Sequence, residues 1–364
     1  MRQKISNLQL MLLVANFIFT STIISLPQIM VQIGEQNTWM IPIILFPVFL
    51  FLTFLIFGKK LHVDRLSRMF LIGQQSKVLE KGFVLIFIAF ASILFLRDLR
   101  GVIDFIAAVL LPNTPIDMIM VLSVFVLVYV SMAGIEVISR INAVHFGILF
   151  VIILLLPLLL LNEWQIGNFQ PLPHFKTVTS LIKSSFFTFA WMGEMVLFIL
   201  VIANVNPVGA ARKAVISGTA LGLFMFLIIL ILDISVLGVK LVSEAAYPSY
   251  ILIQQINLTD FLDRIDLLIV AVWVPTFFAK AAYLLYAINY CTSFLYKSNT
   301  NKFLFPIGLI LGYLSILLFK NSMNHLHFSF YTWTSLGLFL EVMIIVLYIV
   351  IRIRYKDIKE PLHS

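Results

Sequence analysis

The sequence has little charge. Asp, Glu, Lys and Arg make up 12% of its 364 residues, whereas hydrophobic residues make up 61%. A soluble domain carries roughly a quarter charged residues, so about half of the usual polar surface is missing. Runs of 17 or more uncharged residues recur along the chain, and a spanning helix needs roughly 20 such residues. The composition excludes a soluble protein and predicts an integral membrane protein.

Three further absences narrow the class of protein. The single cysteine, Cys291, excludes an internal disulfide. Solid Leu, Ile and Phe runs lack the apolar–polar alternation of a transmembrane β-barrel, so the spans are predicted to be helices. The sequence has no nucleophile elbow, no phosphate-binding glycine loop and no metal-ligand quartet. We therefore expect no enzyme activity, no cofactor and no metal site.

Ten transmembrane helices are predicted, and the basic, uncleaved N-terminus leads into the first of them. Together they make one transmembrane domain over 1–364, with two pseudo-repeats of five spans at about 1–165 and 175–355. The predicted spans are 8–33, 38–58, 82–111, 116–135, 141–161, 180–203, 213–238, 264–294, 303–320 and 330–351.

Basic residues are distributed unevenly between the connecting segments. Of 25 Lys and Arg residues, 17 fall in the termini and in the loops on the same side as the termini, and four fall on the opposite side. This bias places both termini in the cytoplasm. It also accounts for the net charge of +8, so no nucleic-acid partner is predicted and membrane lipid is the expected partner. The longest segment on the other side, 239–263, mixes apolar and polar residues and predicts a folded outer cap.

Two spans are interrupted at corresponding places in the two halves. The first reads "TSTIISLP" and the sixth reads "FAWMGE". Paired interruptions predict a transporter-like binding site near the bilayer midplane, where unwound backbone meets a ligand. The alternative is local: Ser and Thr side chains bond back to the preceding turn, and Pro27 only kinks its helix. The candidate ligand-binding residues in these two spans are Thr20, Ser21, Thr22, Ser25, Trp191, Gly193 and Glu194.

Glu194 is the one charge between Lys183 and Arg212. A charge at bilayer depth costs at least ~2.5 kcal/mol, so it needs a polar cavity, a proton or a partner. It could hold a ligand amine, rigidify the broken backbone, or pin two helices as a protonated group. The nearest cationic candidate is Lys280 in span eight, on about the same face as Trp273 and Tyr283. We include Lys280 among the ligand-binding candidates.

Span three contains the densest polar cluster, "LRDLRGVID". Arg100 and Asp104 form an i, i+4 pair, and Asp98 balances Arg97. This intramembrane polar cluster could line an extracellular vestibule or tie helices together, and intramembrane ion pairs serve both purposes.

Two other polar positions have simpler interpretations. Asp233 lies near the outer end of span seven and is predicted to be interfacial. His325 and His327 are predicted to be loop histidines, since no further metal ligand is near them.

The chain resembles the endospore germination permease family, the B subunits of spore germinant receptors. That family lies within the amino acid–polyamine–organocation superfamily. The resemblance rests on five stretches spread over nearly the whole chain: "ISLP" (24–27), "LLPNTP" (110–115), "GIEVISR" (134–140), "FAWMGEMVLF" (189–198), and "YPSY" through "DFLDRIDLLIVAVWV" (247–274).

The resemblance implies an all-α polytopic membrane protein with the LeuT-type 5+5 inverted repeat and broken helices one and six. It implies a nutrient sensor in the spore inner membrane that works with A-type and lipoprotein C-type subunits. Its ligand would be an amino acid, a sugar or a nucleoside. Amino acid permeases commonly place glycines at the first break, where this chain has "TST", which argues against carboxylate capture by bare backbone amides. The alternative function is a proton- or cation-coupled amino acid permease.

Overall fold

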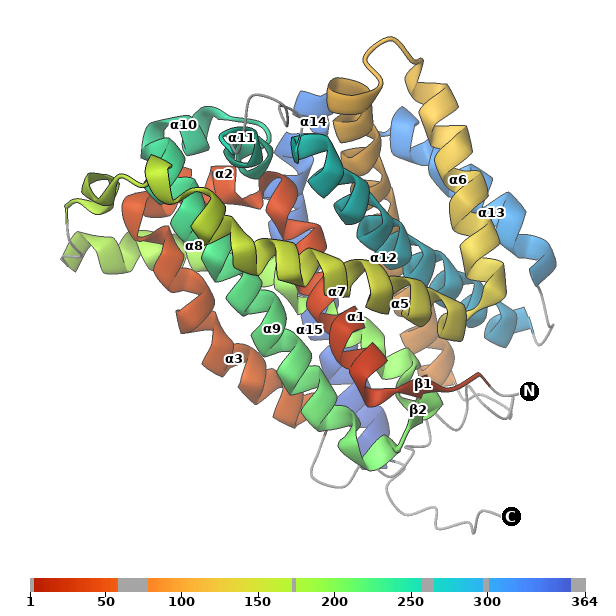
Figure 1. The fold of residues 1–364 in the computed structure, drawn as a ribbon. Helices are drawn as coiled ribbons and strands as arrows, with labels where there is room; N and C mark the ends of the chain where they lie inside the picture. The colour runs from red at the N-terminus through yellow and green to blue at the C-terminus, as the bar shows by residue number, and fades with distance from the viewer. Residues whose placement is uncertain (1–2, 58–77, 172–174, 257–264, 297–300, 355–364) are drawn as a thin grey trace.

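The computed structural model describes residues 3–57, 78–171, 175–256, 265–296 and 301–354. Helices dominate, and they pack into one bundle in which the two short strands lie at the end nearest both termini (Figure 1). The first half contains β1 (Ile5–Ser6), α1 (Asn7–Thr20), α2 (Thr22–Gly34), η1 (Glu35–Met40), α3 (Ile41–Ile56), α5 (Val78–Phe105), η2 (Ile106–Leu110), α6 (Ile116–Ala133), α7 (Ile135–Leu159), η3 (Leu161–Glu163) and η4 (Ile166–Phe169). The second half contains α8 (Phe175–Met192), η5 (Gly193–Leu200), η6 (Ile202–Asn204), β2 (Val205–Asn206), η7 (Val208–Ala210), α9 (Ala211–Leu232), η8 (Asp233–Leu237), α10 (Gly238–Glu244), α11 (Pro248–Gln254), α12 (Ile265–Tyr296), η9 (Asn301–Phe303), α13 (Leu304–Leu317), α14 (Ser322–His327), η10 (Phe328–Thr332) and α15 (Trp333–Arg354).

Eight helical segments of the described chain are long and apolar enough to cross a membrane. Two shorter apolar helices, Asn7–Thr20 and Asn301–Leu317, accompany them. The segment Thr22–Ile56 covers the second half of predicted span one and residues 38–56 of predicted span two, 38–58. All ten predicted spans are therefore helical, and their ends differ from the prediction by a few residues.

Local sequence explains where α1 begins and how it packs. The Ser6 hydroxyl accepts from the Gln9 amide and the Gln9 side chain accepts from the Ser6 amide, which is a capping box. Helix α1 then packs against α9, where Gly218 and Gly222 are four residues apart. A Cβ at Gly222 would come within 2.9 Å of the Ala15 carbonyl oxygen, so glycine permits the close approach of the two backbones.

Connections predicted to share a side of the membrane lie at the same end of the bundle. Strand β1 pairs in parallel with β2, with Ile5 opposite Val205. The Gln3 side chain donates to the Ala133 carbonyl at 3.0 Å, which joins the N-terminus to the α6–α7 turn at that end. The basic residues of 58–77, 297–300 and 355–364, on which the orientation depends, lie outside the described residues. Which end faces the cytoplasm stays a prediction.

The opposite end carries the cap. Helices α10 and α11 pack on α2 and cover that end of the bundle beside α14 (Figure 1). The predicted outer cap is thus folded as helices over its described part, whereas residues 257–264 lie outside the described chain.

Candidate functional site

The first helix break falls at Ser21, between α1 and α2. A helix end leaves backbone carbonyls without helical partners, and α12 supplies two donors for them. Trp273 Nε1 donates to the Thr20 carbonyl at 3.3 Å, and Lys280 Nζ donates to the Phe17 carbonyl at 3.4 Å. The break is thereby held in place by the aromatic and basic face of α12.

The hydroxyls at this break play different parts. Thr22 Oγ1 donates to the carbonyls of Ile18 and Phe19 at 2.8 and 2.7 Å, which is the local back-bonding of the alternative interpretation. Thr20 Oγ1 bonds to the Asn16 side chain on its own helix. Ser21 instead donates to Asp98 Oδ2 on α5 at 3.1 Å.

The second break is at Gly193, where α8 ends and the chain continues as the 3₁₀-helix η5. Tyr283 of α12 donates from its hydroxyl to the Leu197 carbonyl of η5 at 2.9 Å. A Cβ at Gly193 would overlap the carboxyl group of Glu341 on α15. Glycine is therefore required for the contact between the break and α15.

Lys280 connects the two breaks. Its ammonium lies 2.5 Å from Glu194 Oε2 in η5, 2.6 Å from Ser21 Oγ and 3.0 Å from Asp98 Oδ2. The Lys280 side chain is 0% exposed. A buried ammonium is stable only when paired and hydrogen-bonded, and here its partners come from three other elements.

Arg97 completes this central cluster from α5. Its Nη2 lies 2.6 Å from Asp98 Oδ1 and 2.8 Å from Glu194 Oε1. Its guanidinium carbon lies 4.3 Å from the Trp191 ring centroid and 4.6 Å from that of Trp333, so two indole faces sandwich the cation. The central cluster, defined as Arg97, Asp98, Glu194 and Lys280, has two positive and two negative groups and is neutral.

Arg100 and Asp104 lie one and two turns further along α5. They form the predicted i, i+4 pair at 2.9 Å. Arg100 Nη1 also donates to the Phe319 carbonyl at 2.8 Å, which ties α5 to the end of α13. His325 of α14 bonds through Nε2 to the Arg97 carbonyl at 2.9 Å, and its Nδ1 lies 3.7 Å from Asp104 Oδ2.

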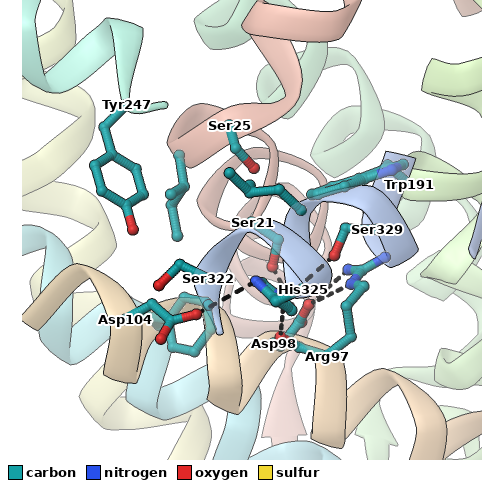
Figure 2. Close-up of a pocket in the computed structure, with 14 residues that line it drawn as sticks. Ser21, Ser25, Arg97, Asp98, Asp104, Trp191, Tyr247, Ser322, His325 and Ser329 are labelled. Carbon is teal, nitrogen blue, oxygen red and sulfur yellow. Dashed lines mark hydrogen bonds and ion pairs between the residues drawn. The ribbon is translucent and has the colours of Figure 1, made fainter. Parts of the chain in front are cut away.

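A pocket lies between the central cluster and the capped end of the bundle (Figure 2). The pocket is partly open to solvent. Burial and the Asp104 carboxylate raise the pKa of Tyr247 to about 12, so its phenol stays a hydrogen-bond donor at neutral pH. The lining residues are Ser21, Ile24, Ser25, Arg97, Asp98, Gly101, Asp104, Trp191, Tyr247, Phe277, Ser322, His325, Leu326 and Ser329.

The predicted site residues divide into two groups. Ser21, Ser25 and Trp191 line the pocket, as do three members of the predicted polar cluster, Arg97, Asp98 and Asp104. The remaining predicted residues do not line the pocket. Glu194 and Lys280 lie in the central cluster, Gly193 lies against Glu341, and Arg100 ties α5 to α13. Thr20 bonds to Asn16 and to Thr276 of α12, and Thr22 donates back to carbonyls of α1.

Two sequence interpretations were wrong. His325 is buried rather than a loop histidine, because α14 folds back onto α5 and places the ring against the Arg97 carbonyl. Asp233 is fully buried rather than interfacial, because α11 covers it and Ser249 donates to its Oδ2 at 3.1 Å. Sequence position along a span does not reveal these covering elements.

Glu341 is a residue that the sequence analysis did not single out. It is the one charge between Lys320 and Arg352, so the reasoning that singled out Glu194 applies to it equally.

Among the described residues, no group of three or more His, Cys, Asp or Glu side chains is placed to hold a metal ion.

Comparison with solved structures identifies the fold. The chain is similar to Mhp1, a nucleobase-cation-symport-1 family transporter solved in a closed conformation with bromovinylhydantoin bound. The TM-score is 0.59 at 14% identity, over 98% of this chain and 80% of that one. This likeness confirms the predicted fold class, the LeuT-type inverted repeat with broken helices one and six.

Sequence comparison identifies the family. The chain is 27% identical to the Bacillus subtilis protein YfkT over 83% of its own length and 84% of that protein's. It is 27% identical to spore germination protein KB of the same organism, over 67% of each chain. The family described as "Spore germination protein" matches residues 4–325. The chain therefore belongs to the spore germination permease family and is an integral membrane protein.

Proposed function

We propose that this chain is the membrane subunit of a spore germinant receptor, and that a small nutrient binds in the pocket and signals germination. One observation supports this most: the pocket touches both helix breaks. Ser21 is the residue between α1 and α2, and Trp191 stands two residues before Gly193. A ligand in the pocket contacts the two places where the spans can bend.

The lining is suited to a small polar nutrient. Four serine hydroxyls and the Tyr247 phenol offer neutral hydrogen-bonding groups, and Trp191 and Phe277 offer apolar faces. Pockets with a few placed polar groups among apolar faces are typical of small-molecule sites. An amino acid, a sugar or a nucleoside would each find partners here.

Signalling follows from how the pocket joins the central cluster. Arg97 and Asp98 belong to both. A ligand that binds Arg97 weakens the ion pair between Arg97 and Glu194, and one that binds Asp98 weakens the ion pair between Asp98 and Lys280. Either change allows the two breaks to shift. The ligand can favour the shifted conformation only to the extent that it binds that conformation more tightly than the closed one.

The proposed membrane location and partner subunits are based on membership of the family. We place the chain in the spore inner membrane with both termini in the cytoplasm, without catalytic activity of its own, and with A-type and lipoprotein C-type receptor subunits as partners. Names of relatives such as spore germination protein KB support a role in germination.

A second candidate function is a proton- or cation-coupled amino acid permease. The observation that favours it is the likeness in fold to a nucleobase–cation symporter. Uptake of radiolabelled amino acids into proteoliposomes that contain this chain alone would support this alternative, and absence of uptake with retained binding would favour the receptor.

The proposal is tested by germination dose–response in spores. Ser25→Leu puts bulk into the pocket, whereas Gly147→Leu puts similar bulk where a Cβ meets nothing within 4 Å. At equal abundance in spore membranes, Ser25→Leu should need more nutrient for the same response and Gly147→Leu should not. Equal curves for Ser25→Leu and the unmodified chain would remove the pocket from nutrient sensing.

A further inference from the structure

Helix α15 carries a carboxyl group that the central cluster does not use. Glu341 is 1% exposed, and neither of its oxygens has a hydrogen-bond partner among the described residues. It faces the second break, because a Cβ at Gly193 would overlap this carboxyl. A buried carboxyl without a partner is rare in folded proteins and requires an explanation.

The charged groups around Glu341 belong to two neighbouring elements. Helix α15 packs against α5 and η5, and the fields of Arg97 and Glu194 reach Glu341 from them. Arg97 is already bound to Asp98 and Glu194. Within the described chain, no Lys, Arg or His nitrogen lies within ion-pair distance of Glu341.

The described side chains of the other elements packed on α15 offer Glu341 no counter-charge. Helix α3 has no titratable side chain. Helix α8 contains Lys176 and Lys183. Lys183 is exposed and ten residues before the break, roughly 15 Å along a helix, and Lys176 is seven residues further from the break in the sequence. The segment η10 contributes the phenol of Tyr331, and His325 of α14 is bound to the Arg97 carbonyl.

The charge balance then constrains the state of Glu341. The central cluster is neutral without it, since two cations face two carboxylates. An ionised Glu341 would leave one uncompensated negative charge, and buried charges without partners are strongly unfavourable. A proton or a bound cation must therefore neutralise it. The described residues offer no third His, Cys, Asp or Glu side chain to complete a metal site, which favours the proton.

We propose that Glu341 is a proton-binding site, occupied in this conformation, whose ionisation is coupled to the break at Gly193. Loss of the proton would place a second carboxylate in the field of Glu194 and against the Gly193 backbone. Repulsion between the two carboxylates is relieved when η5 moves away from α15. Proton binding at Glu341 thus stabilises the closed packing of η5 on α15, whether or not a nutrient is bound.

Infrared spectroscopy of the full chain in lipid bilayers tests this without any nutrient, so its outcome is separate from that of the receptor proposal. A protonated carboxyl with no hydrogen bond gives a carbonyl stretch distinct from that of a carboxylate. The difference spectrum of the unmodified chain minus Glu341→Gln should contain this protonated band at neutral pH. Asp233→Asn is the matched control, because Asp233 is also fully buried but lies on η8, and its removal should leave the Glu341 band in place.

Two further variants complete the test. If Glu341→Gln does not fold, Glu341→Asp should move the band instead of abolishing it. Gly193→Ala, which presses on the carboxyl, should shift the pH at which the band fades. The proton site would be overturned if the difference spectrum contained a carboxylate band instead of a protonated carboxyl band. It would also be overturned if the band changed when Na⁺ was replaced by K⁺. An unchanged titration in Gly193→Ala would overturn the coupling to the break.

Discussion

Lys280 Nζ lies 2.5 Å from Glu194 Oε2 although 86 residues separate them in the chain. The same ammonium also donates a hydrogen bond to Ser21 Oγ at the first break. One side chain of α12 therefore fixes both interrupted spans relative to each other. The two breaks are therefore linked through Lys280, and the contribution of this link to the free energy of unfolding can be measured.

Neutralising Glu194 should destabilise the protein. Glu194→Gln leaves Arg97 and Lys280 with one carboxylate between them, and breaking a buried ion pair from one side costs roughly 3–5 kcal/mol. We expect a similar loss for Lys280→Met. The measurement is the free energy of unfolding in detergent by denaturant titration.

The double variant Glu194→Gln/Lys280→Met restores charge neutrality, because Arg97 and Asp98 remain. It should lose less stability than the sum of the two single variants. Strictly additive losses would mean that the 2.5 Å contact carries no coupling.

Gly193→Ala should destabilise the second break, because its methyl group would overlap the Glu341 carboxyl. Overpacking of this kind costs roughly 1–3 kcal/mol. Shortening the neighbour with Glu341→Ala should recover most of the loss. Gly147→Ala, with nothing within 4 Å of its new methyl, is the control and should not lower the thermal unfolding midpoint. A Gly193→Ala protein as stable as the Gly147→Ala protein would contradict the predicted contact.

The helices and both breaks were predictable from local features. Uncharged runs of spanning length set the spans, and Gly193 and the serine and threonine cluster marked the interruptions, whereas Pro27 lies inside α2. The Glu194–Lys280 pair was also within reach, because isolated charges in apolar spans must find partners. These features depend on short stretches of sequence or on simple charge balance.

The assembly of the site was not predictable in the same way. Arg97 and Asp98 were grouped with Arg100 and Asp104 by their spacing, yet the first two join the central cluster and Arg100 ties α5 to α13. His325 lines the pocket because of how α14 packs on α5. Helical periodicity gives the face of a residue but not the helix that this face will meet.

Substitutions of the two tryptophans around Arg97 should distinguish an effect on stability from an effect on nutrient sensing. Replacing either indole by leucine removes one cation–π face, which is worth about 0.5–2 kcal/mol. Trp191 lines the pocket and Trp333 does not. We expect Trp191→Leu and Trp333→Leu to lower the unfolding midpoint similarly, and only Trp191→Leu to change the germination dose–response at matched abundance. Equal effects of the two on dose–response would show that the pocket face of Trp191 contributes nothing specific.

Substitutions of Arg100 and of Asp104 should have different effects, although the two side chains form an ion pair. Arg100→Met removes the bond to the Phe319 carbonyl and leaves Asp104 buried without its partner, so the amount of folded protein should fall. Asp104→Asn keeps the volume of a pocket-lining group and changes its charge, so nutrient sensitivity should shift more than abundance. Immunoblots of spore membranes, read beside dose–response curves, measure both. If Asp104→Asn depletes the protein as much as Arg100→Met does, the pair is a helix tie alone.

The most direct test of the central claim is nutrient binding to the purified chain. A panel of radiolabelled amino acids, sugars and nucleosides is titrated against the full chain, and the dissociation constant is compared between Ser25→Leu and Gly147→Leu. We predict that at least one nutrient binds, that Ser25→Leu weakens it tenfold or more, about 1.4 kcal/mol, and that Gly147→Leu leaves it unchanged. Equal affinity in both variants, or binding by no member of the panel, would contradict a nutrient site between the two helix breaks.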